Sequence, residues 1–388
     1  MTREVACMGY GMTIFRRRMR ETGKEMCWEA AKMALDDAGL TLNDIDMVVF
    51  GSAPDAFDGI HMKHENMIDG SGGTRRPISR VYVGGGTGVF SAIAAWWHVA
   101  SGMAERVLVV NEEKMSSCQP HAQSVFAHIW DPILDRPLKP NLVWIFSMEM
   151  NRYMNAYGIP HEDIATVAVK NKRNAVAHPC AQLADPNITV QDVLNSEPMA
   201  LPVRRLDISP PSDGASALVF ASDDVVRQHT DDPVYISGVG WNLDTTMWTT
   251  RDLVFPTYVA RAAKAAYKMA GITNPRKQID VAEPYDPFDY KECHHMEGLG
   301  LAPKGQAARQ VAEGLHDRTS DLPTCPSGGL LGVGNPIAAT LGIKVGELYL
   351  QLAGKAGKRQ VSNNPHNGVT QAWGDLMQVG TVVTMRRG

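Results

Sequence analysis

The sequence predicts an α/β protein made of two similar halves, and three observations support this prediction. Strand-like and helix-like segments alternate along the first 110 residues, which is typical of a sheet of parallel strands. A glycine-rich turn joins a strand pattern to a helix pattern within residues 81–102. An early helix pattern also recurs 232 residues later, which predicts an internal duplication.

The expected elements follow one another in a regular order. A short apolar run predicts a first strand, and an amphipathic pattern that stops at Gly39 predicts the helix after it. Runs rich in Val and Ile predict buried parallel strands. The expected segments are strands at 5–8, 45–50 and 106–110, helices at 25–39 and 142–157, and a glycine-containing turn that leads into a buried strand within 206–222.

The turn within 81–102 is the most informative stretch of the sequence. Gly84, Gly85 and Gly86 are followed by Thr87 and Gly88, and then by a helix of small apolar residues. Such a turn lets a ligand or another backbone come close, and a helix N-terminus offers free N–H groups. A turn of this kind usually presents a nucleophile or holds an anion, but no nucleophilic side chain stands at its tip.

The internal repeat is visible in the helices. Segment 29–41 (EAAKMALDDAGLT) aligns without gaps to segment 261–273 (RAAKAAYKMAGIT), and seven of thirteen positions are identical. A second glycine-rich turn at 327–342 also leads into a small-residue helix pattern. A chance match between two alanine-rich helices is the alternative. Duplication explains more, so we expect an N-terminal half at 1–225, with an inserted loop domain at about 115–205, and a C-terminal half at 226–388.

Composition narrows the function classes. The net charge is −4 and 21% of residues are charged, so we expect neither nucleic acid nor an anionic membrane as a partner. No apolar run approaches the roughly 20 residues of a membrane span, and the N-terminus does not resemble a signal peptide. Six scattered cysteines without CxxC spacing suggest reduced thiols. We therefore expect a cytoplasmic protein.

Several motifs resemble those of the thiolase superfamily in the same order along nearly the whole chain. They are GGGTGVFSAIAAWWHVASG, NEEKMS, AVKNKRNAVAHPCAQL, DISPPSDGASALV, AEPYDPFDYKECHHMEGLGLAPKGQ and PSGGLLGVGNPIAATLG. The third and fourth are similar to the loop-domain stretch of archaeal and sterol-carrier-type thiolases. The resemblance implies the thiolase fold, in which two βαβαβαββ halves form a five-layered αβαβα core with an inserted loop domain. It also implies an acyl-CoA thioester as substrate and a homodimer.

The departures from the thiolase pattern bear on mechanism. The family pattern implies a Cys in the first turn, a His in the strand-end loop and a His or Cys in the last turn. Gly85, Tyr285 and Asn335 stand at these positions. Covalent acyl transfer needs an activated thiolate, which glycine cannot supply. Cys325 falls where the family usually has a pocket-lining Asn, so it is either a displaced nucleophile or part of the pocket wall.

These substitutions resemble the steroid side-chain aldolases, a branch that lacks the Cys, carries GGG in the first turn and has Tyr before Asp in the strand-end loop. Tyr285–Asp286 fits this pattern. The second Tyr of that branch, in the final turn, is Asn335 here, which departs from it. The resemblance further implies a separate zinc-ribbon OB-fold subunit that helps to seat the CoA thioester.

Retro-aldol cleavage needs a base for the β-hydroxyl proton and donors for the enolate oxygen. Tyr285 is the candidate base or relay, provided that nearby donors lower its pKa, and Asp286 and Glu283 are candidates to orient it. The Asn335 amide and the backbone N–H groups of the turn formed by Gly85, Gly86, Thr87 and Gly88 are candidate donors. His366 and Gly368 lie in a late loop that borders the pocket in the family.

Other interpretations stay open at this point. Tyr285 is alternatively a buried structural tyrosine, and His366 a surface-turn residue. Cys293–His294–His295 invites a metal site, but neighbours on a helix face different ways, so we expect no metal in this chain. Trp96–Trp97 either packs the helix or contacts substrate. Besides the retro-aldol enzyme, the alternatives are an acetyl-CoA acyltransferase or thiolase that uses Cys325 or direct attack by CoA, and a non-catalytic CoA-ester-binding subunit.

Overall fold

A mixed sheet of nine strands forms the frame of the computed structural model, which describes residues 3–53, 55–119, 121–374 and 376–388. Its strand order is β3-β2-β4-β7-β1-β8-β11-β10-β9. The strands are β1 (Val5–Met12), β2 (Met47–Gly51), β3 (Ile78–Val81), β4 (Arg106–Lys114), β7 (Asp213–Ser222), β8 (Val234–Leu243), β9 (Val281–Glu283), β10 (Asn367–Gly374) and β11 (Val379–Arg387), with β5 (Pro198–Ala200) and β6 (Val203–Arg204) as a separate pair.

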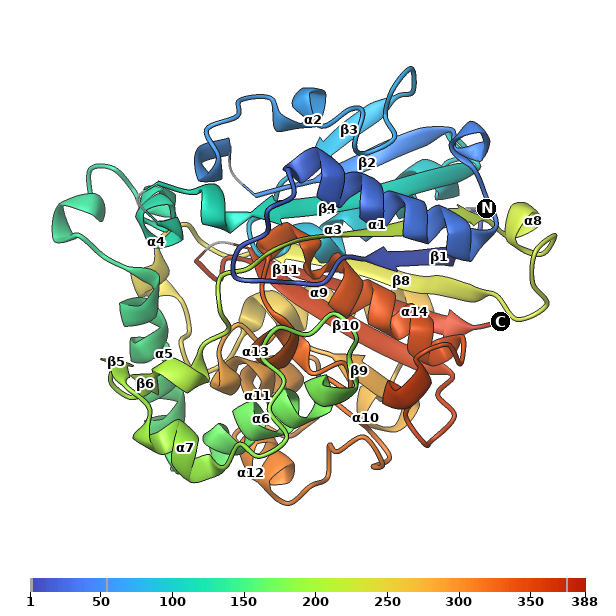
Figure 1. The fold of residues 1–388 in the computed structure, drawn as a ribbon. Coiled ribbons are helices and arrows are strands. Elements are labelled where there is room, and N and C mark those ends of the chain that lie inside the picture. The colour runs from blue at the N-terminus through green and yellow to red at the C-terminus, as the bar shows by residue number, and fades with distance from the viewer. Residues whose placement is uncertain (1–2, 54, 120, 375) are drawn as a thin grey trace.

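The helices cover both faces of this sheet and fill the lower part of the molecule in Figure 1. They are α1 (Gly23–Ala38), α2 (Lys63–Asn66), α3 (Thr87–Ala100), α4 (Ala122–Phe126), α5 (Leu142–Tyr157), α6 (His161–Asn174), α7 (Val190–Asn195), α8 (Asp223–Val226), α9 (Thr257–Ala270), α10 (Pro275–Gln278), α11 (Asp289–Gly298), α12 (Ala307–Ala312), α13 (Gly329–Val333) and α14 (Glu347–Leu352). The helix expected at 142–157 is found with these bounds. No helix in the described ranges is both long and apolar enough to traverse a bilayer.

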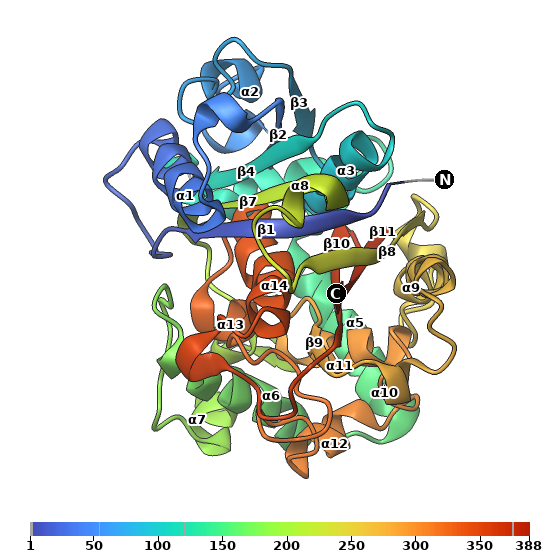
Figure 2. The same ribbon diagram turned by 90° about the vertical axis from the view of Figure 1, so that its right-hand side faces the viewer.

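The sheet confirms the predicted duplication. The N-terminal strands have the order β3-β2-β4-β7-β1. The C-terminal strands repeat it as β9-β10-β11-β8, with Thr324 pairing beside Ala282 where the counterpart of β3 would lie. The two half-sheets join only where β1 pairs with β8, through Ala6–Tyr235 and Cys7–Val234. Figure 2 shows the N-terminal strands above the C-terminal ones.

The early strands share one direction, as predicted, but one strand of opposite direction is inserted among them. Strands β3, β2 and β4 pair in parallel, but β7 is antiparallel to both β4 and β1. Strand β7 is the strand expected after the glycine-containing turn within 206–222, and it enters the sheet between β4 and β1 in the opposite direction. Strands β1 to β4 therefore share one direction, and the strand inserted among them runs against it.

Contacts between elements give the five layers. Helix α1 packs on the outer face of β1, β7 and β4, and α9 packs on β8 and β11. Helix α3 contacts β4, β2 and β7 on one side and β10 and β11 on the other. The π-helical segment before α14 contacts β1 and β7 of the first half-sheet, and α14 contacts β9, β10 and β11 of the second. The order is thus helix, half-sheet, buried helices, half-sheet, helix.

The second glycine-rich turn differs from the simple expectation of one helix. Between α13 and α14 the chain passes through a 3₁₀ segment (Ile337–Thr340) and a π-helical segment (Gly342–Gly346). Pro336 precedes the first segment and Gly334 has a φ of 130°. Proline and a residue in this conformation end a regular helix, which breaks the expected one into short pieces.

A close strand–helix contact repeats in both halves. A Cβ at Gly9 or Gly11 of β1 would lie 2.2 or 2.1 Å from the carbonyl oxygens of Ala34 and Ala30. In the second half, a Cβ at Gly238 or Gly240 of β8 would lie at the same distances from the carbonyl oxygens of Ala266 and Ala262. Each outer helix therefore needs a Gly-x-Gly strand beneath it, because any side chain there would push the helix away.

Replacing Gly240 by Ala tests this contact. We expect Gly240→Ala to lower the free energy of unfolding by about 3 kcal/mol, because the added methyl meets backbone rather than a movable side chain. Urea denaturation of the variant gives the measurement. Gly73→Ala is the control, since its new methyl would come closest to the movable Cδ1 atom of Ile78, at 3.1 Å, and would lie at ordinary contact distance from Ser71 Oγ (3.5 Å) and the Ile68 carbonyl oxygen (3.6 Å). Equal losses in the two variants would contradict the repeat contact.

Candidate active site

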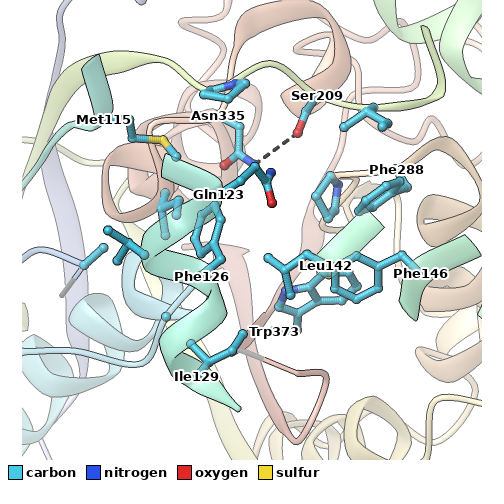
Figure 3. Close-up of a pocket in the computed structure, with 18 of the residues that line it drawn as sticks. Met115, Gln123, Phe126, Ile129, Leu142, Phe146, Ser209, Phe288, Asn335 and Trp373 are labelled. Atoms are coloured by element: carbon cyan, nitrogen blue, oxygen red, sulfur yellow. Dashed lines mark hydrogen bonds between the residues drawn. The ribbon is translucent and has the colours of Figure 1, made fainter. Parts of the chain in front are cut away.

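One pocket of about 140 Å³ lies at the carboxyl ends of the parallel strands. Sheets of this kind bind ligands at that edge because the loops after the strands converge there. The lining residues come from the turn after β3, from the segment between β4 and β7, and from the loops of the C-terminal half (Figure 3). They are Ala53, Tyr82, Gly84, Gly85, Met115, Gln123, Val125, Phe126, Ile129, Leu142, Val143, Phe146, Ile208, Ser209, Pro211, Tyr285, Pro287, Phe288, Asn335, Ile337 and Trp373.

Tyr285 brings a hydroxyl to this pocket from the loop after β9. Its backbone is fixed on both sides, because its N–H donates to Gln371 Oε1 over 3.2 Å and its C=O accepts from His295 Nδ1 over 2.6 Å. The hydroxyl donates to Asn335 Oδ1 over 3.4 Å. Burial raises the pKa of Tyr285, although nearby Lys344 and the Asn335 hydrogen bond oppose this. The condition for Tyr285 to act as a free base, a pKa lowered by nearby donors, is therefore not met, and the side chain is a neutral phenol at physiological pH.

Gly85 and Tyr285 share one small space. A Cβ at Gly85 would lie 2.9 Å from the Tyr285 hydroxyl oxygen and 2.9 Å from the Trp373 carbonyl oxygen. Real Cβ atoms essentially never come so close, so a side chain at position 85 requires the tyrosine or the Trp373 backbone to move. The phenol thus stands where the side chain of a nucleophile in the first turn would begin.

The rest of this turn is held by its own hydrogen bonds. Thr87 Oγ1 donates to the Gly84 carbonyl over 2.6 Å and accepts from the Val83 N–H over 2.9 Å. The N–H groups of Gly86 and Thr87 donate to the carbonyls of Val83 and Gly84. A Cβ at Gly88 would lie 2.6 Å from the Leu341 nitrogen. Of the predicted turn residues, Gly85 lines the pocket, whereas Gly86, Thr87 and Gly88 shape the turn, and two of the expected N–H donors are already used.

Asn335 reaches the pocket from the second glycine-rich turn. Its Nδ2 donates to Ser209 Oγ over 3.0 Å, and its backbone N–H donates to Ser212 Oγ over 3.1 Å. Ser209 is itself tied to the strand-end loop, since its N–H donates to the Pro287 carbonyl over 2.9 Å. An amide carries two N–H donors, so one bond to Ser209 leaves the second hydrogen for a ligand oxygen. Sequence reasoning missed Ser209.

Glu283 and Asp286 lie beneath the pocket rather than along it. Lys344 Nζ lies 3.3 Å from Glu283 Oε2, 2.9 Å from Asp286 Oδ1 and 2.6 Å from the Pro284 carbonyl oxygen. Asp286 also accepts from the Leu330 N–H over 2.9 Å. These bonds hold both ends of the loop that carries Tyr285.

This buried network continues into α6 and carries excess negative charge. Asn171 donates to Asp286 and to Glu292, and Lys170 Nζ lies 2.7 Å from Glu292 Oε1. Two ammonium groups, on Lys170 and Lys344, face three carboxylates. Burial raises the pKa of Glu283 to about 7, against the opposing effect of Lys344. Sequence reasoning did not assign Lys170, Asn171 or Lys344 to the site, although Lys170 and Asn171 lie in a quoted motif.

Cys325 lies outside the pocket and has no exposed surface. Its Sγ donates to the Pro284 carbonyl over 3.4 Å, and Lys344 Nζ is 3.8 Å away. Burial, together with Asp286 and Glu292, raises the pKa of this thiol well above its ordinary value. A buried neutral thiol behind the Tyr285 loop does not fit the role of a nucleophile.

His366 and Gly368 do not reach the pocket, contrary to expectation. The 363–374 region is strand β10 over most of its length, and only its end, Trp373, lines the pocket. A strand rises about 3.3 Å per residue, which places Gly368 roughly 16 Å from Trp373 along the strand. The His366 N–H donates to Asp280 Oδ2 at that far end. Trp373 is the site residue that sequence reasoning missed here.

The Cys293–His294–His295 triplet and the Trp96–Trp97 pair both lie outside the pocket lining. His294 Nε2 pairs with the Val254 carbonyl, His295 pairs with the Tyr285 carbonyl, and Cys293 lies in the core, so this triplet does not converge. Trp97 makes edge-to-face contacts with Phe90 and Trp241. Neither Trp96 nor Trp97 lines the pocket.

Two groups of side chains bring metal-type donor atoms within 4.8 Å of one another in the described ranges. One contains Asp286, Glu292 and Cys325, where Lys170 and Lys344 already place ammonium groups. The other contains His161, Asp207 and Asp289. Burial and the neighbouring Asp207 raise the pKa of Asp289 well above its ordinary value.

Comparison with known proteins agrees with this architecture. A family model described as the thiolase N-terminal domain matches residues 8–195, and one described as thiolase C-terminal domain-like matches 241–387. An acetyl-CoA acetyltransferase of Methanothermobacter thermautotrophicus is 32% identical over 92% of this chain and 93% of its own length. A steroid side-chain-cleaving aldolase of Thermomonospora curvata is 29% identical over 84% and 85%. The solved Ltp2-ChsH2(DUF35) aldolase superposes with a TM-score of 0.82 at 25% identity, covering 98% of this chain and 97% of that one.

The raised pKa of Glu283 predicts a pH dependence of stability. The folded protein keeps this proton up to about pH 7, whereas an unfolded glutamate loses it near its ordinary value of 4.5. The stabilisation that this proton gives the folded protein is complete below the pKa of Glu283 in the unfolded chain. It is lost as the pH rises through the pKa of Glu283 in the folded protein. Between pH 5 and pH 8 the wild type should lose about 3 kcal/mol more than Glu283→Gln, measured by urea denaturation. The exposed Glu29→Gln control should follow the wild type, and an unchanged slope in Glu283→Gln would contradict the assignment.

Proposed function

This chain belongs to the thiolase superfamily of enzymes, and from that premise we propose that it cleaves, or in reverse forms, the Cα–Cβ bond of a β-hydroxyacyl-CoA by aldol chemistry. The contact between Gly85 and Tyr285 carries the proposal, because the place of an attacking sulfur in the first turn is taken by a phenol. The similarity to a steroid side-chain-cleaving aldolase supports it. Coenzyme A enters as part of the substrate thioester.

The side chains support a proton relay. The β-hydroxyl proton passes to Tyr285 Oη as the Cα–Cβ bond breaks and the β-carbon becomes a carbonyl. In the same step the bonding pair moves to Cα, with enolate character developing on the shortened thioester, and Cα takes the proton that Tyr285 held, so that Oη never carries two protons. One proton thus moves from oxygen to carbon, and the phenol is regenerated. Because a relay starts from a neutral phenol, the raised pKa of Tyr285 suits it better than the role of a free base.

Asn335 is the candidate donor to the thioester oxygen in this proposal. Its free amide hydrogen faces the same pocket as the Tyr285 hydroxyl, and Ser209 and Ser212 fix the orientation of the side chain. A prepositioned donor stabilises negative charge that develops on the oxygen during bond cleavage.

The proposal also covers the subunits with which this chain assembles and its place in the cell. The name of the solved Ltp2-ChsH2(DUF35) aldolase includes a DUF35 component, and we propose a similar small zinc-ribbon OB-fold partner and a homodimer for this chain. The six cysteines are unpaired and buried, which supports a cytoplasmic location.

An acetyl-CoA acetyltransferase that uses Cys325 is the second candidate, since the Methanothermobacter relative is named acetyl-CoA acetyltransferase. The placement of Cys325 argues against this mechanism. Direct attack by CoA without an enzyme nucleophile, and a non-catalytic CoA-ester-binding role, are separated from the aldol mechanism by the assays below.

Tyr285→Phe tests the relay. We expect kcat for cleavage of a β-hydroxyacyl-CoA to fall by about 10²–10⁴-fold with little change in KM, because the variant lacks the hydroxyl that moves the proton. Tyr267→Phe is the matched control, since that hydroxyl only donates to the Leu299 carbonyl in the core. Unchanged turnover in Tyr285→Phe would remove the relay. A purified assembly that binds CoA esters but never cleaves them would indicate the non-catalytic role.

Cys325→Ala separates aldol cleavage from thiolysis. Aldol cleavage consumes no free CoA, so we expect the reaction to proceed without added CoA and the variant to keep kcat within about threefold of the wild type. Mass spectrometry of the CoA products, with and without free CoA, gives the measurement. An absolute requirement for free CoA together with loss of activity in Cys325→Ala would favour the acetyltransferase. A requirement for free CoA that Cys325→Ala does not alter would favour direct attack by CoA.

A further inference from the structure

We propose that the β-carbon of the substrate carries a single uncharged aromatic ring, so that cleavage releases an aryl aldehyde or aryl ketone. This inference rests on the proposed function and adds the substrate class. It follows from the walls of the pocket, its size, and the positions of its few polar groups.

Aromatic side chains form much of the apolar wall. Phe146 lies nearly parallel to Trp373, with ring centroids 5.0 Å apart and an interplanar angle of 21°, and it contacts Phe288 at 4.8 Å. Phe126 comes from α4, beside Ile129 (Figure 3). Aromatic pairs in such arrangements favour a further ring, because offset and edge-on contacts add to simple burial.

The wall is also supported from behind. Lys291 Nζ lies 4.3 Å from the centroid of the Trp373 ring and forms an ion pair with Glu149, and both side chains are buried. Tyr290 donates to Glu149 Oε2 over 2.5 Å. Because the lysine is held in this pair, Trp373 has a fixed backing, and the pocket does not widen there without breaking buried contacts.

The size of the pocket matches one ring. A cavity of about 150 Å³ lined by aliphatic and aromatic side chains holds a benzene molecule. The pocket here measures about 140 Å³. A nucleus of several fused rings exceeds this space, whereas a methyl group leaves most of it unfilled.

The polar groups lie together and none of them is charged. Figure 3 shows Asn335, Ser209 and Gln123 gathered on one side, and Phe146, Leu142 and Trp373 lying apart from them. Among the residues that the structure describes, the pocket lining includes no Lys, Arg, Asp, Glu or His. A carboxylate or ammonium group on the ring would therefore lose its hydration without gaining a partner. The ring belongs on the apolar side, with its β-hydroxyl toward Tyr285.

The test compares three CoA thioesters on the full chain, assayed together with any small subunit that co-purifies. They are 3-hydroxy-3-phenylpropanoyl-CoA, 3-hydroxybutanoyl-CoA and 3-hydroxy-3-(2-naphthyl)propanoyl-CoA. We expect kcat/KM for the phenyl substrate to exceed that for the methyl substrate by about 50-fold, from the extra apolar area buried. The naphthyl substrate should be cleaved at least about tenfold less efficiently than the phenyl one.

Two variants sharpen the test. Phe126→Ala should shift the preference toward the naphthyl substrate, while Phe90→Ala, a partly buried aromatic outside the pocket, should leave the preference unchanged. Binding of 4-fluoroacetophenone, followed by ¹⁹F NMR line broadening, reports on the ring site without catalysis. We expect binding to wild type and its loss in Phe146→Ala.

The outcomes separate the two proposals. Equal efficiency with methyl and phenyl, or a preference for naphthyl, would overturn the ring assignment and leave the aldol function standing. Cleavage of none of the three thioesters would count against the aldol function, whereas broadening of the fluoroketone signal that Phe146→Ala removes would still support the ring site.

Discussion

The contact between Gly85 and the Tyr285 hydroxyl is the constraint on which the site depends. A Cβ at position 85 would lie 2.9 Å from that oxygen, so the first turn and the strand-end loop cannot both present a side chain to the same point. A thiolase scaffold that places a phenol there has given up nucleophilic attack from the turn. Burial keeps this phenol neutral, and its hydroxyl donates to Asn335, whose amide Ser209 and Ser212 hold in place.

Holding a neutral phenol at that point requires a loop that does not move. On one side, Lys344 binds Glu283, Asp286 and the Pro284 carbonyl. On the other, His295 pairs with the Tyr285 carbonyl, and its second nitrogen lies 3.0 Å from the Tyr258 hydroxyl. Buried charges are costly, and they persist only where each one is paired. Each ion pair alone adds little to the stability of the fold. Together these networks fix the position of the loop that carries the Tyr285 hydroxyl.

Much of the fold could be read from the sequence, and less of the site. Seven identities between two helices predicted the duplication, because each outer helix must present the same small residues to its strand. Gly85, Tyr285 and Asn335 were predicted together and do share the pocket. Trp373 and Ser209 were missed because their roles depend on where a strand ends and which loop lies across from it. His366 was misplaced because a glycine-containing stretch that resembles a loop is paired as strand β10.

The duplication also explains how chemistry and specificity come from different parts of the chain. Each half contributes one glycine-rich turn, Gly85 from the first and Asn335 from the second, and the two turns meet because the buried helices behind them pack together, as the Gly88–Leu341 contact demonstrates. The walls that select the substrate come partly from elsewhere, since Phe126 and Phe146 belong to the segment between β4 and β7. The side chains of Phe126 and Phe146 can change without disturbing the turns, whereas Ser209 and Ser212 of the same segment hold Asn335 in place. The pocket can therefore take a new substrate group while the relay stays in place.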